Sequence, residues 1–220
     1  MPSPTMNRRD FSAALLASGA TSSLFASAGA RAQGVAPVDG RDFTKVEPPQ
    51  PTSIPGKIEV LEFFSYACPH CSAFEPTLEA WARDLPGDVV LKRVPVPFLL
   101  NADNFAHTYY ALETLGLVDK MQAKIFAAVH VDHLRLDKPE DIAAVVAKNG
   151  GDAAKFLAAF KSFSVATSVA RAKKMTADYK VDGVPTLAVQ GHFLTSPEKA
   201  GGAPQSLGVV DALILRSRKG

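Results

Sequence analysis

The sequence predicts an α/β protein, and three observations support this fold class. A near-continuous apolar stretch over residues 57–64 is typical of a strand buried on both faces of a sheet. A long region from residue 101 to residue 179 carries helical periods of apolar side chains. Strand character returns at residues 186–194, before a last helix. Strands and helical segments in this arrangement indicate a sheet covered by helices.

The first 32 residues have the features of a cleavable export signal. Basic residues at Arg8-Arg9 precede an Ala- and Leu-rich run over residues 13–28, and small residues flank position 31. This order of basic, apolar and small-x-small segments is typical of a secretory signal. We therefore expect residues 1–32 to be removed after Ala32 and to lie outside the fold.

The export route is predicted from finer details of this segment. The paired arginines, followed two residues later by Phe11, resemble a twin-arginine signal. The polar residues 18–23 and Arg31 next to the cleavage site also favour that route. A general secretory signal, in which the arginine pair is incidental, is the alternative; a retained anchor is disfavoured because the apolar run is short and interrupted. Either signal leads to an oxidising compartment.

The composition excludes several classes of protein. Of 220 residues, 47% are hydrophobic, which is enough for a core, and only 2 are Cys, which is too few for a disulfide-stapled scaffold. No apolar run beyond the N-terminus reaches the roughly 20 residues that span a bilayer. Removal of residues 1–32 takes three basic residues and one acidic residue from totals of 24 and 22, which leaves 21 of each. This balance argues against binding to nucleic acid.

The segment that follows the signal is predicted to be extended. Residues 33–56 contain five prolines, so we expect an N-terminal arm with a short edge strand at about residues 43–46. The strand at residues 57–64 comes next. It leads through Cys68-Pro69-His70-Cys71 into a helix over residues 72–83, whose apolar side chains recur with a helical period, and then into a strand at residues 89–96.

Helices dominate the middle of the chain. Asp137 followed three residues later by Glu140 predicts the N-terminal box of a helix, and Gly150-Gly151 predicts a helix end. A last long helix of this region is expected to reach about Tyr179. Beyond it, strands flank the two-residue turn Gln190-Gly191, and the final helix is predicted over about residues 204–215.

The two cysteines carry the predicted chemistry. A disulfide that closes so short a loop adds little stability, since the entropic benefit grows with loop length. A zinc site would need two more ligands, for which His130 and His133 are the candidates, but their spacing is not that of a zinc motif, and we expect both at the surface. Redox chemistry by Cys68 and Cys71 is therefore the favoured interpretation.

The expected position of Cys68 explains why it would react. At the start of a helix, free backbone N–H groups and the positive end of the helix dipole stabilise a thiolate. Pro69 is tolerated in the first helical turn, and His70 adds a polar neighbour that can carry positive charge. Such surroundings lower a thiol pKa. We expect Cys68 to be a good leaving group and Cys71 to be the more buried, resolving thiol.

Two segments resemble a known family. Residues 60–71, including Cys-Pro-His-Cys, are similar to the active-site region of DsbA-type periplasmic thiol:disulfide oxidoreductases, and residues 183–186 (Gly-Val-Pro-Thr) resemble the cis-proline loop that faces the cysteines in thioredoxin folds. The resemblance implies a thioredoxin fold with an inserted helical domain. Residues 57–97 and 180–220 would form the thioredoxin-like domain, and residues 98–179 the insertion.

The resemblance also assigns further site residues. It implies a cis bond between Val184 and Pro185, with the backbone of Val184 free to pair with a substrate chain beside Cys68. The residues alone would favour a trans proline. It also places Glu62 under the disulfide, where it helps to transfer a proton to the inner cysteine.

Glu62 stands in an otherwise apolar strand, where a carboxylate is costly unless it is paired or functional. Lys92 or Arg93 on the neighbouring strand could pair with it. The alternative is that Glu59 and Glu62 mark a solvated face of the strand.

The expected function follows from this resemblance. We expect a periplasmic enzyme that donates a Cys68–Cys71 disulfide to reduced, unfolded exported proteins through a mixed disulfide at Cys68, with no metal and no cofactor besides that disulfide. A quinone-linked membrane oxidase similar to DsbB would reoxidise it, and a monomer is the simplest state. The alternatives are a reductase or isomerase of the same fold, or a module that binds a soft metal through Cys68 and Cys71.

Overall fold

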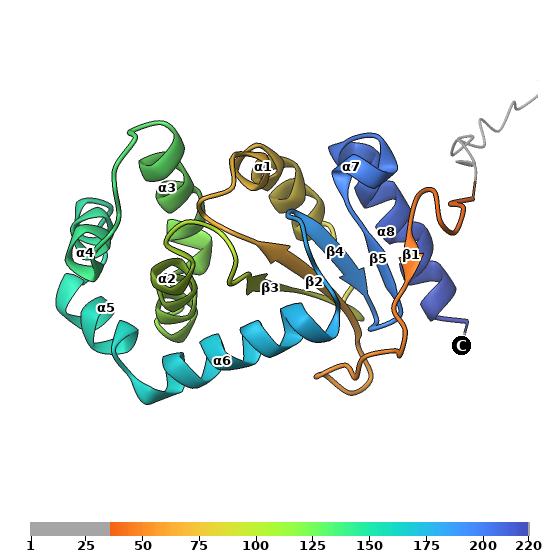
Figure 1. Ribbon diagram of the computed structural model, residues 1–220, viewed down its shortest axis with the longest axis horizontal. Helices are drawn as coiled ribbons and strands as arrows, with labels where there is room; N and C mark the ends of the chain where they lie inside the picture. Colours follow the sequence, from red (N-terminus) through yellow and green to blue (C-terminus); the bar gives the residue numbers. More distant parts are fainter. Residues whose placement is uncertain (1–35, 220) are drawn as a thin grey trace, which may run out of the picture. The chain divides into compact units, whose positions relative to one another are not determined.

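The computed structural model describes residues 36–219 (Figure 1). The predicted export signal at residues 1–32 lies outside the described residues. The strands are β1 (Thr44–Lys45), β2 (Ile58–Phe64), β3 (Val89–Pro95), β4 (Thr186–Val189) and β5 (Phe193–Thr195). The helices are α1 (Pro69–Arg83), α2 (Ala102–Thr114), α3 (Val118–His130), α4 (Pro139–Lys148), α5 (Ala153–Phe160), α6 (Phe163–Asp178), α7 (Pro197–Ala200) and α8 (Ala203–Ser217).

Within residues 36–219, the strands form one mixed sheet in the order β1-β5-β4-β2-β3 (Figure 1). Strand β2 is parallel to β3 and antiparallel to β4, so it lies inside the sheet and is buried along its whole length. The register places Glu62 opposite Arg93. Strand β1 pairs with β5 at one edge, which confirms the predicted edge strand of the N-terminal arm.

Both faces of the sheet are covered by helices, which explains the near-continuous apolar sequence of β2. Val60 and its neighbours on one face pack against α1 and α8. Leu61 and Phe63 point to the other face, where α6 packs on them through Ala172. Side chains of a strand alternate between its two faces. Glu62 therefore lies on the face of β2 that meets α1, and Glu59 lies on the face that meets α6.

The helices α2–α6 lie between β3 and β4 in the sequence (Figure 1). Apolar side chains of α2–α5 share one cluster with both cysteines and with Phe64 and Tyr66 at the end of β2. Those of α6 belong to other clusters. Residues 36–219 belong to one compact unit, so the division at residues 98–179 stays a prediction. The helical region therefore forms one wall of the cysteine site.

Two local predictions have different outcomes. The turn at Gln190-Gly191 is confirmed, because both residues have positive φ, of 51° and 71°, and the His192 amide donates to the Val189 carbonyl at 3.0 Å. The second strand begins at Phe193, one residue later than predicted. The N-terminal box at Asp137 is wrong. Pro139 takes the first helical position, so Lys138 caps α4 without a side-chain bond, and Asp137 instead accepts a hydrogen bond from Asn101 at 2.8 Å.

No helix in the described part of the chain has both the length and the apolar character needed to cross a membrane. The short helix α7 was not predicted from the sequence; Ser196 caps it by accepting a hydrogen bond from the Lys199 amide at 3.1 Å. Strand β2, helix α1 and the loop before β4 are the elements that bring the predicted site residues together.

Candidate active site

Cys68 occupies the cap position of α1, where the chain leaves the central strand. Its backbone is extended (φ −87°, ψ 116°), and Pro69 follows as the first helical residue. The backbone N–H has no partner within the helix at that position, so proline loses no hydrogen bond there. The Cys71 amide donates a hydrogen bond to the Cys68 sulfur at 3.3 Å. The sulfur therefore takes the place of the Ser or Asp oxygen that caps many helices.

The loop before β4 faces this sulfur. The Val184–Pro185 peptide bond is cis, which confirms the prediction made from the family resemblance. The Cys68 thiol donates to the Val184 carbonyl at 3.4 Å. The two segments, which are more than 110 residues apart in the sequence, are thus in direct contact at the reactive sulfur.

The pKa values of the two thiols move in opposite directions. A hydrogen bond from the Cys71 side chain, together with backbone N–H bonds and the charge of His70, lowers the pKa of Cys68 to about 6, although burial opposes this. The same thiol–thiol bond and burial raise the pKa of Cys71 far above its ordinary value. Cys68 is therefore the thiol that ionises near neutral pH, while Cys71 holds its proton. Both are free thiols in this structure.

His70 and Pro185 both line a groove beside the start of α1. The groove has a volume of about 570 Å³ and is lined by α1, the cis-proline loop, α7 and the start of α8. Cys68 itself is only 5% exposed, and Cys71 is fully buried.

Glu62 is fully buried on the face of β2 that packs against α1. Arg93 lies next to it on β3, with 3.0 Å between Nε and Oε2, so the prediction that Lys92 or Arg93 pairs with this carboxyl is confirmed for Arg93. The two groups are not aligned as a hydrogen bond, and neither oxygen of Glu62 has a hydrogen-bond donor among the described residues. Charge attraction holds this pair together.

Arg93 also binds two acidic residues of α1 that the sequence analysis missed. Its Nη2 lies 3.1 Å from Glu75 and also contacts Glu79. Burial raises the pKa of Glu62 to about 7 and that of Glu75 to about 8, while Arg93 lowers both. Three carboxyl groups around one guanidinium are not all ionised at neutral pH, so this cluster can hold a proton beside the cysteines.

A signal for these residues does exist in the sequence. Glu75 and Glu79 follow Cys71 at intervals of four residues, so they lie on the same side of the helix as the inner cysteine. The side chain of Glu75 is buried beside the apolar stripe of α1, in contrast to the usual solvent exposure of helix carboxylates. The acidic residues thus share a face with Cys71.

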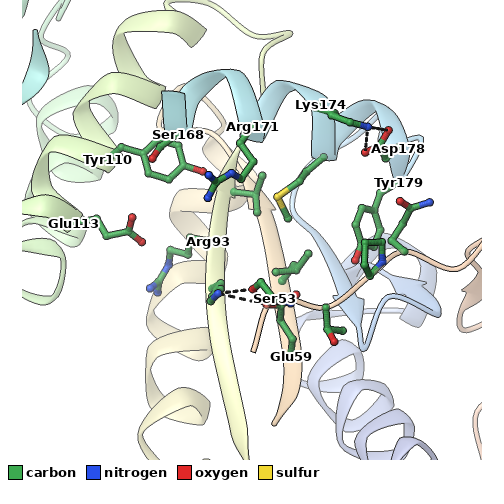
Figure 2. A pocket seen from close by; sticks show the side chains of 17 residues that line it. Ser53, Glu59, Arg93, Tyr110, Glu113, Ser168, Arg171, Lys174, Asp178 and Tyr179 are labelled. Carbon is green, nitrogen blue, oxygen red and sulfur yellow. Dashed lines mark hydrogen bonds and ion pairs between the residues drawn. The ribbon is translucent and has the colours of Figure 1, made fainter. Parts of the chain in front are cut away.

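Glu59 lies on the opposite face of β2 and belongs to a second cavity, of about 420 Å³, under α6 (Figure 2). It is buried and pairs with Lys92 at 3.4 Å, while Ser53 donates a hydrogen bond to it. The alternative that Glu59 and Glu62 mark a solvated face is therefore wrong: the two carboxylates are buried on different faces, each beside a cation. This cavity contains neither cysteine.

His130 and His133, the alternative zinc ligands, do not approach the cysteines as a metal site. The described residues contain no group of three His, Cys, Asp or Glu side chains that could hold a metal ion. His133 is exposed, as expected, whereas His130 is only partly exposed. His130 is half-buried at the end of α3, and its Nε2 lies 2.8 Å from the Tyr66 carbonyl.

Comparison with known proteins decides the family. The family model of the DSBA-like thioredoxin domain matches residues 59–204. The chain belongs to this family. It is 43% identical over 220 residues to the thiol:disulfide interchange protein DsbA of Bordetella parapertussis, with all of both chains covered. It is 41% identical to the DsbA of Burkholderia cepacia, over 84% of this chain and 88% of the relative.

The structural comparisons agree with this family. The crystal structure of Pseudomonas aeruginosa DsbA matches with a TM-score of 0.79 at 38% identity, over 83% of this chain and 95% of that one. The Xylella fastidiosa DsbA matches with a TM-score of 0.78 at 29% identity, over 84% and 99%. This DsbA-family chain is a thiol:disulfide oxidoreductase with a thioredoxin fold, as the resemblance of its two segments implied.

The acidity of Cys68 predicts its reactivity. We expect the rate of alkylation of the reduced protein by iodoacetamide to rise with pH around a midpoint of about 6, with Cys68 alone modified, because only its thiolate forms in that range. Mass spectrometry identifies the modified residue, and Cys68→Ser is the control that removes the reaction. A midpoint near about 8.5, the value of a free thiol, would contradict the role of the helix cap.

The buried acid predicts a second effect. Glu62→Gln keeps the shape of the side chain but cannot pass a proton to Cys71, so we expect formation of the mixed disulfide with a reduced peptide to slow by about tenfold or more, with the fold unchanged. Rapid-quench kinetics with a reduced peptide measures the rate, and circular dichroism checks the fold. Glu59→Gln, on the opposite face of the same strand, is the matched control. Equal rates of mixed-disulfide formation in the two variants would argue against proton transfer by Glu62.

Proposed function

We propose that this oxidoreductase works in the oxidising direction: it donates a Cys68–Cys71 disulfide to reduced, newly exported proteins. The observation that carries this proposal is the split between the two thiols, with the pKa of Cys68 lowered to about 6 and that of Cys71 raised. A stabilised thiolate favours the reduced form over the disulfide. The disulfide is then readily given up to a partner.

The reaction needs two exchange steps. A substrate thiolate attacks the Cys68 sulfur, the bond between Cys68 and Cys71 breaks, and its electron pair leaves on Cys71, which takes up a proton. A second substrate thiolate then attacks the substrate sulfur of the mixed disulfide and releases Cys68 as a thiolate. Two substrate thiols are oxidised and one protein disulfide is reduced, so the proposed disulfide is the sole redox group.

The cluster around Arg93 supports the first of these steps. Cys71 leaves as a thiolate in a buried place, where burial disfavours negative charge, and therefore requires a proton. Glu62 and Glu75, whose pKa values are raised to about 7 and about 8, hold protons near neutral pH on the side of α1 that carries Cys71. We assign Glu62 the transfer of this proton.

The substrate is proposed to bind along the groove and the cis-proline loop. An extended chain that pairs with the Val184 backbone would place its cysteine beside Cys68. Exposed apolar side chains at Phe98–Leu100, which follow β3, and at Val131 and Leu134, which follow α3, support binding that tolerates many sequences, because apolar contacts are not directional. An unfolded protein offers the complementary apolar surface.

The location and the partner complete the proposal. We infer that the enzyme acts in the periplasm after cleavage of residues 1–32, and that a quinone-linked membrane oxidase similar to DsbB restores its disulfide. It would act as a monomer and without a metal. These proposals rest on the family and on the signal-like sequence of residues 1–32.

The redox potential tests the direction of the reaction. Equilibration of the purified protein with glutathione buffers, followed by alkylation and gel shift, gives the ratio of dithiol to disulfide. We expect a potential well above the value of about −270 mV that is typical of thioredoxin, because the Cys68 thiolate stabilises the reduced form. A potential at the thioredoxin end would instead identify a reductase of the same fold.

A further inference from the structure

Helix α3 contacts the segment that carries the reactive cysteine. The Nε2 of His130, the last residue of α3, lies 2.8 Å from the carbonyl oxygen of Tyr66, two residues before Cys68. We propose that His130 is a positioning residue for the oxidoreductase: its hydrogen bond to the Tyr66 carbonyl orients the loop that presents Cys68. The inference rests on the function proposed above and adds a residue from outside the Cys-Pro-His-Cys helix.

The Tyr66 carbonyl shows which ring nitrogen of His130 carries a hydrogen. A backbone carbonyl only accepts hydrogen bonds, so Nε2 must carry the hydrogen and donate it. The imidazole also stacks on Phe126, one turn earlier in α3, with the ring centroids 6.2 Å apart and the planes at 28°. The stacking fixes the ring at the end of the helix. His130 therefore presents a fixed donor to the loop.

Tyr66 makes a second hydrogen bond to the same helix. Its hydroxyl donates to the side chain of Gln122, and the tyrosine is fully buried among the side chains of α2 and α3. Gln122 thus holds the end of the Tyr66 side chain, while His130 holds its main chain. Of these two bonds, the bond from His130 acts closer to Cys68 along the backbone.

The short loop after β2 transmits this constraint. The Ser65 carbonyl accepts a hydrogen bond from the Cys68 amide at 3.0 Å, and the Ser65 hydroxyl accepts one from the Ala67 amide at 3.1 Å. The Tyr66 peptide therefore lies inside a tight turn that ends at the helix cap. A rotation of this peptide would move Cys68 relative to both groups that its sulfur contacts, the Cys71 amide and the Val184 carbonyl.

Loss of the His130 hydrogen bond is expected to affect the stability of the Cys68 thiolate. Hydrogen bonds weaken steeply as their geometry departs from the optimum. Loss of the His130 donor would loosen the Tyr66 peptide and weaken the bond from the Cys71 amide to the Cys68 sulfur. The Cys68 thiolate would then be less stabilised, and alkylation would require a higher pH.

A pair of variants separates the donor from the packing. His130→Phe keeps an aromatic ring on Phe126 but removes the donor, whereas His130→Gln keeps an N–H donor at a similar reach. His133→Asn is the control, because His133 is exposed three residues later and has a positive φ of 52°, which asparagine tolerates. All variants are made in the full chain, and thermal unfolding monitors their folding.

The readout is the pH profile of Cys68 alkylation, with the glutathione equilibrium as a second measure. In His130→Phe we expect the midpoint to move upward, alkylation at pH 6 to slow by about threefold, and the redox equilibrium to shift toward the disulfide, which corresponds to the loss of one hydrogen bond. His130→Gln restores the wild-type values in part, and His133→Asn matches wild type.

Two outcomes would overturn the positioning role. One is a folded His130→Phe whose alkylation profile and glutathione equilibrium equal those of His133→Asn. The other is a profile that shifts equally in His130→Phe and His130→Gln, since this would show that the imidazole packing, and not the donor, matters. Failure of the wild-type protein to oxidise peptide thiols would count against the proposed function instead, so the two proposals fail separately.

Discussion

The hydrogen bond from the Cys71 amide to the Cys68 sulfur is the interaction on which the chemistry of the site depends. It requires that the chain leave β2, turn within three residues and begin a helix with Cys68 at its cap. The inner thiol, Cys71, lies one turn further into the helix and is fully buried. The strand, the turn and the helix together place Cys68 at the N-terminus of α1, where negative charge on its sulfur is stabilised.

The rest of the fold supports this geometry from several sides. Strand β2 is paired on both edges inside the sheet, and it packs against α1 and α8 on one face and against α6 on the other. The cis-proline loop brings the Val184 carbonyl to the sulfur, and helix α3 holds the turn at Tyr66. Below the cysteines, Arg93 keeps three carboxyl groups in place, although burial of such groups is costly. The cost supports the role in proton transfer that is proposed for Glu62.

Much of this arrangement could be predicted from the sequence, because its signals are local. The apolar run of β2, the Cys-Pro-His-Cys segment and the Gln190-Gly191 turn each reflect a requirement of the backbone within a few residues. Glu62 could be recognised because a carboxylate in a buried strand is unusual. The cis form of the Val184–Pro185 bond was expected only from the family resemblance.

The features that were missed depend on contacts between distant segments. His130 was assigned to the surface because nothing in its own neighbourhood shows that the end of α3 meets Tyr66, which precedes it by 64 residues. The pairing of Arg93 with Glu75 and Glu79 likewise depends on how α1 lies across β3. Asp137 failed as a cap because Pro139 fixed the helix start one residue later than the local pattern indicated. Tertiary packing decides such details.

The central claim is that folding stabilises the Cys68 thiolate, and one measurement tests it directly. Denaturant unfolding of the dithiol and disulfide forms, between pH 5 and pH 8, compares their free energies of unfolding. Because the pKa of Cys68 is lowered to about 6 in the folded protein, the thiolate contribution is lost as the pH falls through that value. We predict that the dithiol form is the more stable at pH 8 and that its advantage shrinks toward pH 5. A disulfide form that is more stable at pH 8, or a difference that does not change with pH, would contradict the account.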